Sequence, residues 1–432
     1  MMDKRTMIII SVGVMGIFVI ILGIWLVFFN SGRDQGANVL APVPSKPSLE
    51  GLPQAGLQDG TSGTVQQSQS QGGLAVSGTR GSISDLPQLG DEGAQIGNVS
   101  DVAQGGYTAI TPTTPSGSFQ NIAISGDGSV RYYDQSKGQF VEVSLDQKTQ
   151  YLSQDAFPSA KQVVWSQSGD KAVVEFPDGY NIIYDFAHDK QVTLPKEAEG
   201  FSFSPSSQEV AYKMMTTDFW QNWLAVSSTD GESIQNVEHL GDNGVLVRVD
   251  WSPNNQVIAF YTKGETGDTQ KIYPLGKNQE NLPALRVAGR GFEEVWAPTG
   301  DKLLYSVRSE TTNHNPTLWI TDARPETMGE NNVPLYVQTW AEKCVFRSNG
   351  ESVICAVPQE LPQGSGLFPE LAKKIPEDFY EIDIFTGKTT LLAKPVGAPP
   401  GLKATDLHIS SDGKDLIFRD STLGGVYRMG LE

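Results

Sequence analysis

The chain has 432 residues, enough for two or three ordinary domains or for one large repeat domain with additional segments. Its 50 acidic and 32 basic residues give a formal charge of -18, which repels phosphate groups and argues against nucleic acid as a partner. The acidic residues form no block, so they predict a solvated surface rather than a charged tail.

The first predicted element is a membrane anchor at residues 7–29, where every residue is apolar, Gly or Ser. A helix of this length measures roughly 35 Å, which spans the hydrocarbon core of a bilayer. A cleaved secretory signal is the alternative, but its apolar region would be shorter. Lys4 and Arg5 precede the run and only Arg33 follows it closely, so we expect residues 1–6 to be cytoplasmic and the rest of the chain extracytoplasmic.

Residues 30–106 are predicted to be a disordered linker. They contain no Phe, Trp or Tyr and are rich in Gly, Ser, Gln and Pro. Without large apolar side chains, such a segment cannot offset the entropy lost when a backbone becomes ordered. As a flexible coil its ends would lie on the order of 50 Å apart, so we expect it to tether the C-terminal part of the chain to the anchor.

A repeated unit fills residues 107–432, where short alternating strands flank polar turns. Its clearest copy runs from Val249 to Phe260. One position aligns across the copies: Ile124, Trp165, Phe203, Trp251, Trp296, Phe346 and Ile409. Most spacings are about 38 to 50 residues, the period of a four-stranded propeller blade. We therefore predict an all-β, seven-bladed β-propeller, with a six-bladed ring as the alternative.

The copies that begin at Phe203, Trp251 and Trp296 share an aromatic residue, Ser-Pro or Ala-Pro, a polar turn, and an apolar strand that ends in Phe or Tyr. They resemble the WD40-like β-propeller repeats of the TolB type, whose signature is aromatic-Ser-Pro-Asp-Gly-Lys-x-Ile-Ala-Phe. The resemblance covers about residues 120 to 432 and implies a propeller. It implies no single activity, because such blades occur in binding platforms, envelope proteins and gating domains of peptidases. The first copy lacks the Pro, and Ile409 replaces the aromatic residue in the last.

The last copy is one strand short, since only three strands follow its start. Residues 107–111, Tyr-Thr-Ala-Ile-Thr, precede the first copy and have high β-propensity. We expect them to supply the outer strand of the last blade, which closes the ring and removes an exposed edge.

The two cysteines fall on opposite strands of one predicted hairpin. Asn349-Gly350 is the strongest two-residue hairpin signal in the chain, and it places Cys344 opposite Cys355. Directly opposed Cβ atoms lie about 4.5–5.5 Å apart, slightly further than a typical disulfide requires. An extracytoplasmic location would permit oxidation. The sequence leaves open a disulfide or two buried free thiols.

No sequence motif for metal or nucleophilic chemistry is present. The four histidines are scattered, and His-Glu-x-x-His, Cys-x-x-Cys and Gly-x-Ser-x-Gly are all absent. We therefore predict no cofactor, no metal site and no catalytic residue, and the sequence leaves enzymatic activity open.

The first candidate binding surface is the mouth of the central channel, where the innermost strands begin. Three residues before each aligned position the copies differ: Asn121, Gln162, Gly200, Arg248, Glu293, Lys343 and Asp406. Their mixed charges, with His408 and Asp250 nearby, suit a polar peptide or sugar. The alternative is that strand starts emerge into water and pair among themselves.

The second candidate surface consists of insertions between the second and third strands of four consecutive blades: residues 214–222, 263–270, 308–316 and 358–377. By propeller geometry they emerge on the same face as the strand starts, and loops on a rigid scaffold often carry binding. Phe219, Trp220 and Phe368 in these loops suit contact with a protein or carbohydrate, unless they fold back to cap a blade.

These features predict a single-pass membrane protein whose extracytoplasmic propeller is a binding or assembly module of the cell envelope. The expected partner is an envelope protein or glycan. The alternative is a propeller hydrolase or lyase that acts on envelope polysaccharide or peptide. Such an enzyme needs convergent carboxylates with perturbed pKa values, and the candidates are Asp250, Glu293, Glu294 and Asp406.

Overall fold

The computed structural model describes residues 98–117, 119–265, 267–397, 401–422 and 424–432. The predicted cytoplasmic tail, the predicted anchor at 7–29 and residues 30–97 of the predicted linker lie outside these ranges. Within the described residues, no helix is long and apolar enough to cross a membrane.

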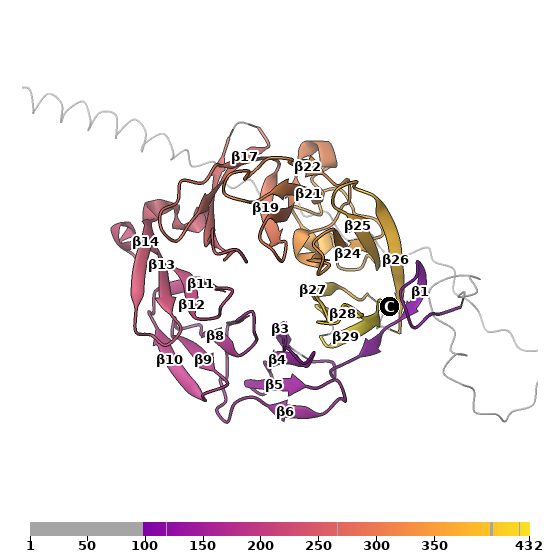
Figure 1. Ribbon diagram of the computed structural model, residues 1–432, viewed down its shortest axis with the longest axis horizontal. Coiled ribbons are helices and arrows are strands. Elements are labelled where there is room, and N and C mark those ends of the chain that lie inside the picture. Colours follow the sequence, from indigo (N-terminus) through magenta and orange to yellow (C-terminus); the bar gives the residue numbers. More distant parts are fainter. Residues whose placement is uncertain (1–97, 118, 266, 398–400, 423) are drawn as a thin grey trace, which may run out of the picture. The chain divides into compact units, whose positions relative to one another are not determined.

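Seven β-sheets form a ring, and each sheet is one blade (Figure 1). In every blade the chain runs from the innermost strand outward through antiparallel neighbours, and in the sixth and seventh blades a strand from the N-terminal segment is added at the outer edge. The predicted seven-bladed propeller is thus confirmed, and the six-bladed alternative is wrong.

The strands of the first three blades are β3 (Phe119–Ile124), β4 (Val130–Asp134), β5 (Gln139–Val143) and β6 (Thr149–Tyr151); β7 (Gln162–Trp165), β8 (Lys171–Glu175), β9 (Asn181–Asp185) and β10 (Lys190–Leu194); and β11 (Ala198–Phe203), β12 (Glu209–Met214), β13 (Trp223–Ser228) and β14 (Ile234–His239). Those of the fourth and fifth blades are β15 (Val247–Val249), β16 (Ala259–Gly264), β17 (Thr269–Leu275) and β18 (Leu285–Ala288); and β19 (Arg290–Trp296), β20 (Lys302–Arg308), β21 (Thr317–Asp322) and β22 (Val333–Pro334).

The sixth blade contains β23 (Cys344–Phe346), β24 (Ser352–Pro358), β25 (Glu377–Asp383), β26 (Thr389–Val396) and β1 (Gly106–Ala109). The seventh contains β27 (Ala404–Ile409), β28 (Asp415–Asp420), β29 (Val426–Gly430) and β2 (Thr111–Pro112). Short 3-10 helices lie in the connections: η2 (Phe219–Gln221), η3 (Gly241–Leu246), η4 (Glu310–Thr312), η5 (Ala341–Lys343) and η6 (Pro369–Ala372).

The residues aligned in the sequence mark the same place in every blade. Six of the seven are the last residue of an innermost strand, and Trp251 lies two residues beyond the end of β15. Trp251 is buried, and its indole Nε1 donates a hydrogen bond to Oδ1 of Asn255 at 2.9 Å. It is therefore a core residue of one blade rather than part of a site.

A serine directly after the aligned residue closes the turn in four blades. Its Oγ accepts a hydrogen bond of 2.9–3.1 Å from the backbone N–H five positions later; the four are Ser166, Ser204, Ser252 and Ser410. The backbone N–H of each serine in turn donates to the carbonyl of that later residue. The serine of the repeat thus satisfies the first donor of the second strand, which explains why it recurs.

Large aromatic side chains on the second and third strands fill the space between neighbouring blades. Phe260 and Tyr305 belong to one apolar cluster that joins the fourth and fifth blades. Phe418 packs with Phe379 in the cluster that joins the sixth and seventh. All four are almost completely buried. Burial of each such side chain contributes about 1.5–3 kcal/mol, so packing between blades holds the ring together.

The N-terminal segment closes the ring, but it spans two blades rather than one. Thr111–Pro112 pairs with β29 as the outer strand of the seventh blade, as predicted. Gly106–Ala109 instead runs parallel to β26 and adds a fifth strand to the sixth blade, so most of the predicted strand lies one blade earlier than expected. The reason is that β26, with 8 residues, offers an edge for another strand, and Ile110 is buried where the segment passes between the blades.

Contacts with the propeller begin before residue 107. Ser100 pairs with Thr108, and Val102 pairs with Gly430 next to the C-terminus. Ala103 is buried in the apolar cluster between the sixth and seventh blades. The described end of the predicted linker therefore packs on the propeller.

Candidate functional site

One face of the ring gathers the features from which a site can be built. Because neighbouring strands alternate in direction, the connections between second and third strands emerge on the face where the innermost strands begin. We call this the loop face. Its longest second-to-third connections are residues 215–222, 309–316 and 359–376.

The innermost strands are irregular where they begin on the loop face. Their pairing with the second strand shifts register in the first, third, fifth and seventh blades, in the last case between Thr405 and His408. Gly291 and Asp406 lie within two of these shifts with φ angles of 68° and 50°, a region that Gly adopts freely and Asp tolerates. Such bulges change the direction of side chains, so each blade presents its strand start differently.

Arg248 on β15 lies among carboxylates from the fourth and fifth blades. Its Nε is 3.2 Å from Oε1 of Glu294 on β19, and its charge also interacts with Asp250 and Glu293. Solvent reaches about half of the Arg248 side chain although protein surrounds it, as expected for a channel wall. The Glu294 carboxylate is fully buried, and neither of its oxygens has a hydrogen-bond partner among the described residues.

The carboxyl groups of this cluster hold protons more tightly than usual. Burial raises the pKa of Glu294 and of Asp250, and the Arg248 charge offsets part of that effect. Burial also raises the pKa of Glu293, with a further contribution from the negative charge of Glu342. A protonated carboxyl group near pH 7 can act as a general acid, so the cluster has the chemistry that the enzymatic alternative requires.

Asp406 and His408 on β27 have partners of their own. Oδ2 of Asp406 accepts a hydrogen bond from Nε of Arg419 on the next strand at 2.6 Å. Burial lowers the pKa of His408, although the Asp406 charge opposes this effect, and the imidazole is therefore neutral at pH 7. Asp406 is committed to an ion pair with Arg419.

Lys343 belongs to a buried charge cluster that joins the sixth and seventh blades. Its Nζ lies 3.0 Å from Oε1 of Glu377 and donates to the Ala404 carbonyl at 2.9 Å. Lys403 lies 3.4 Å from the same carboxylate oxygen and also donates to the Ile375 carbonyl. Two buried lysines therefore share one buried glutamate. The charge of the buried Asp420 also acts on Lys403, so the cluster contains two lysines and two carboxylates.

A pocket of about 400 Å³ opens beside this cluster. Its lining includes the acidic residues Glu293 and Glu342 and the basic residues Lys343 and Lys403, together with Thr405. Trp340 with Pro369 and Ala372 of η6 supply apolar wall, while Glu370, Lys373, Glu377 and Ser421 complete the lining. Two residues predicted from the sequence, Glu293 and Lys343, thus line one cavity.

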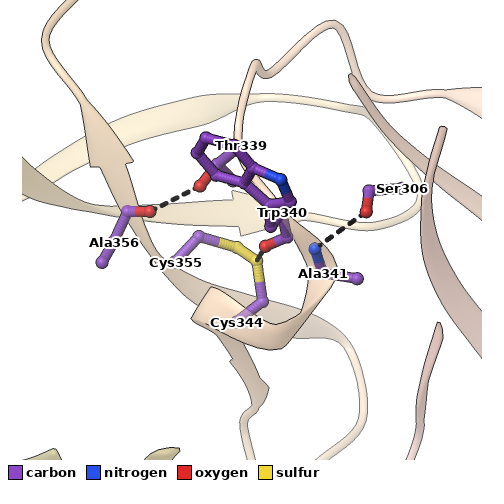
Figure 2. The surroundings of a disulfide bond; sticks show 7 residues. All are labelled: Ser306, Thr339, Trp340, Ala341, Cys344, Cys355 and Ala356. Atoms are coloured by element: carbon purple, nitrogen blue, oxygen red, sulfur yellow. Dashed lines mark hydrogen bonds between the residues drawn. A yellow bond between two sulfur atoms is a disulfide. The ribbon is translucent and has the colours of Figure 1, made fainter. Parts of the chain in front are cut away.

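A disulfide directly follows the short helix η5, which contributes Glu342 and Lys343 to the lining of this pocket. Cys344 is paired with Cys355 in the predicted register, and their sulfur atoms lie 2.12 Å apart (Figure 2). Oγ1 of Thr339 donates to the Ala356 carbonyl at 2.7 Å, and the Ala341 N–H donates to Oγ of Ser306 at 3.2 Å (Figure 2). The segment before β23 is therefore fixed to both the fifth and the sixth blades.

Phe219 and Trp220 are exposed on the loop face although their loop is well anchored. Trp220 is 68% exposed and Phe219 46%. The buried Asn222 accepts a hydrogen bond from the Thr216 N–H at 2.7 Å and donates to the Gly241 carbonyl of η3 at 2.9 Å. The Trp220 ring stacks on the imidazole of His239 on β14, and most of its surface is still exposed.

Phe368 lies on an insertion that is hydrogen-bonded to the neighbouring blade. The N–H groups of Gly364 and Gly366 donate to the carbonyls of Asn313 and His314 at 2.8 and 2.9 Å. Phe368 is 56% exposed and directly precedes η6, so it stands at the rim of the pocket. The insertion is thus a fixed platform rather than a free loop.

The sequence missed several residues that complete the site. Glu377 begins a third strand, Lys403 precedes an innermost strand, and Trp340 lies in a connection between blades, so none occupies a position that the repeat marks. The buried asparagines Asn222 and Asn315, which brace the two insertions, carry no repeat signal either. Across the described ranges no group of three or more His, Cys, Asp or Glu side chains has the arrangement of a metal site.

Comparisons with known proteins support the fold. No protein-family model matches the chain, and no curated protein matches it. Among solved structures, the Cps50 (Swd1) β-propeller domain of Myceliophteria thermophila is 12% identical, with 75% of this chain and 99% of that chain covered and a TM-score of 0.52. Hydrazine synthase of Kuenenia stuttgartiensis is 13% identical, with 73% and 96% covered and a TM-score of 0.50.

An oligogalacturonate lyase in complex with manganese is also similar, at 11% identity over 75% of this chain and 93% of that chain. Its TM-score of 0.49 is too low to support an argument about function. The similar structure from Myceliophteria thermophila is a β-propeller domain, which agrees with the predicted propeller. At these identities the similarity shows the fold of this chain and nothing more, and that fold is a β-propeller.

Proposed function

We propose that this protein is a binding or assembly module of the cell envelope, built on TolB-type propeller repeats, which takes up a partner protein or glycan on its loop face. The observation that carries the proposal is the exposure of Phe219, Trp220 and Phe368 on insertions that hydrogen bonds hold in place. Aromatic residues on a rigid surface bury large apolar area on binding at a small cost in conformational entropy, which is why they dominate interfaces.

We further propose that residues 7–29 anchor the chain in a membrane and that the propeller lies outside the cytoplasm. The apolar run and the basic residues before it support this arrangement. The Cys344–Cys355 bond suits an oxidising compartment. Alkylation of free thiols in intact cells, followed by unfolding without reductant, should leave both cysteines unlabelled; labelling of both would contradict this location.

Partner capture tests the binding proposal. Full-length protein, solubilised in a mild detergent, is used as bait, and bound proteins and glycans are identified by mass spectrometry. Trp220→Ala or Phe368→Ala should lower recovery of the partner at least tenfold, as for an interface hot spot. Phe385→Ala is the matched control, because Phe385 is 67% exposed but lies in the turn between β25 and β26 on the opposite face. Equal recovery with all three variants would refute the proposal.

A hydrolase or lyase that acts on envelope polysaccharide or peptide is the second candidate. It is favoured by one observation, the raised pKa values of Asp250, Glu293 and Glu294 around Arg248. If the channel is catalytic, Glu294→Gln should abolish release of product from isolated envelope material, while Trp220→Ala retains kcat. Unchanged turnover in Glu294→Gln, or no turnover in the wild type, would exclude an enzymatic channel.

A further inference from the structure

Another pocket lies between the outer strands of the first and second blades. It measures about 490 Å³ and is lined by Gln139, Tyr151, Leu152, Ser153, Gln154, Phe186 and Asp189. Tyr151 ends β6, the outermost strand of the first blade, and Phe186 and Asp189 lie in the turn between β9 and β10 of the second. None of the lining residues belongs to the channel cluster or to the insertions of the loop face. The pocket is therefore separate from both candidate surfaces.

Two aromatic side chains supply most of the apolar lining. The Phe186 ring is fixed by rings whose centroids lie 4.9–5.4 Å from its own: Phe140, Trp165 and Tyr184. Tyr151 is 55% exposed, and the Leu152 N–H that follows it donates to the Phe140 carbonyl at 2.9 Å, which fixes the end of β6. Aromatic rings held in this way can pack against a ligand at a small cost in conformational entropy.

The polar groups of the lining have hydrogen-bonding capacity to spare. The side-chain amides of Gln139 and Gln154 bond to no other residue in the described part of the chain. Oδ1 of Asp189 accepts a hydrogen bond from the Tyr184 hydroxyl, which holds the carboxylate in place and leaves Oδ2 for a ligand. A side-chain amide both donates and accepts hydrogen bonds, as a hydroxyl group does. The lining is therefore matched to a ligand that carries several hydroxyl groups.

The charges around the pocket favour an uncharged ligand. The lining contains one carboxylate, Asp189, and no basic residue. Burial raises the pKa of Tyr184, and the charges of Asp189 and Asp155 add to this effect, so a second carboxylate lies close by. The basic groups next to the lining have acidic partners: Lys137 with Asp134 at 3.5 Å, His188 with Asp185 at 3.0 Å, and Lys190 with Asp230. No cation is thus left to attract an anionic ligand.

We propose that this pocket binds a neutral saccharide. A sugar ring packs on Tyr151, its hydroxyl groups exchange hydrogen bonds with the amides of Gln139 and Gln154, and one hydroxyl donates to Asp189. A volume of about 490 Å³ lies within the range of small-molecule sites. The inference goes beyond the proposed function, because it assigns a second site that shares no residue with the loop face.

Isothermal titration calorimetry with the full-length protein, in a detergent without a sugar headgroup, tests the proposal. The probes are three neutral trisaccharides, maltotriose, cellotriose and chitotriose, and one acidic trisaccharide, trigalacturonate. We expect at least one neutral trisaccharide to bind with a Kd of about 1 mM or lower, and trigalacturonate to bind at least tenfold more weakly. No binding of any neutral trisaccharide, or tighter binding of trigalacturonate, overturns the proposal.

Substitutions locate the bound sugar. Tyr151→Ala should weaken binding of the trisaccharide at least tenfold, and Gln154→Ala about three- to tenfold, as expected for the loss of a stacked ring and of a hydrogen bond. Both side chains are exposed, so neither variant depends on the core for folding. Tyr336→Ala is the matched control, because Tyr336 is 85% exposed in the connection between β22 and β23. Equal affinity in the wild type and both pocket variants refutes the site.

A fourth variant distinguishes this inference from the proposed function. Trp220→Ala should lose the partner of the loop face and keep its affinity for the trisaccharide. If Trp220→Ala loses the trisaccharide and Tyr151→Ala keeps it, the sugar binds on the loop face, and the second site does not exist. Loss of the trisaccharide in Tyr151→Ala alone supports the second site even if the wild type captures no partner.

Discussion

The seven blades resemble one another where their innermost strands end and differ from one another where those strands begin. At the end where these strands finish, the blades share one type of turn, which a serine such as Ser252 closes in four of them. An aromatic residue such as Phe260 helps to fill the gap to a neighbouring blade. At the end where they begin, the backbone shifts register in four blades and the side chains differ in charge and size. Arg248, Glu293 and Lys343 occupy the same position in three successive blades, yet their side chains differ in charge and length.

The difference shows that one end of each blade builds the ring and the other end is free to carry function. A turn that is repeated seven times has to satisfy the same backbone donors each time, so its residues are fixed by local geometry. A strand start beside the channel has no such requirement. The buried Glu294 on β19 has a raised pKa in this region, and carboxyl groups with perturbed pKa values are concentrated at functional sites.

Removal of the segment that closes the ring should have the largest effect, because the sixth and the seventh blade both lose their outermost strand. Deletion of residues 98–112 removes β1 and β2 and exposes the edges of the sixth and seventh blades. We expect the Tm, measured by differential scanning calorimetry, to fall by about 10 °C or more. Deletion of residues 60–74 from the predicted linker is the control and should leave the Tm unchanged. An equal Tm for both deletions would show that the segment does not close the ring.

Breaking the buried charge cluster should have the next largest effect. Glu377→Leu leaves Lys343 and Lys403 without their shared carboxylate in a buried site. We expect the free energy of unfolding in urea to fall by about 3–5 kcal/mol. Glu381→Gln, which removes the partly exposed partner of Arg347, should cost about 1 kcal/mol or less. If both variants lose the same amount, the cluster is not a buried charge site.

A change at the repeated end should lower stability without changing binding. Ser252→Ala leaves the backbone N–H of Val257 without its side-chain acceptor in a buried turn. We expect a loss of about 1–3 kcal/mol in the free energy of unfolding and no change in the recovery of the partner. Ser206→Ala, at an exposed position, should change stability by less than about 0.5 kcal/mol. Lower recovery of the partner by folded Ser252→Ala would mean that the two ends are not independent.

The channel carboxylates should make stability depend on pH, with the smallest effect. The folded-state pKa of Glu294 is raised above its unfolded value, so the folded state binds more protons and stability falls as pH rises through the folded pKa. The charged neighbours are Arg248, Asp250 and Glu293. Glu294→Gln should therefore reduce the loss of stability between pH 5 and pH 9 by about 1 kcal/mol, measured by urea unfolding. If the free energy of unfolding of Glu294→Gln depends on pH as strongly as that of the wild type, another group binds the extra proton of the folded state.

Much of the fold could be predicted because the repeat is local. The turn after Trp251 and its copies set the blade count, the ends of the innermost strands and the core aromatic residues. The Asn349-Gly350 turn likewise set the register that places Cys344 opposite Cys355. The path of residues 106–112 could not be predicted in full, because it depends on the free edge of β26, which is distant in the sequence.

The candidate site could be predicted only in part. Counting back from the aligned positions found Glu293 and Lys343, which share a pocket, and Arg248, whose charge reaches Glu293. The same count placed Asp406 at the channel mouth, but a bulge and the pairing with Arg419 decide its surroundings. Their partners, among them Glu377, come from positions that no periodic pattern marks, so only the packing of one blade against the next brings them together.

The most direct test compares Trp220→Ala and Ser252→Ala in the same two assays, Tm and partner capture by the full-length protein. Trp220 is exposed on the loop face, and Ser252 is buried at the repeated end. We predict that Trp220→Ala loses the partner with an unchanged Tm, and that Ser252→Ala lowers the Tm and retains the partner. A lower Tm of Trp220→Ala together with full recovery of the partner would contradict the claim that the loop face is the binding face.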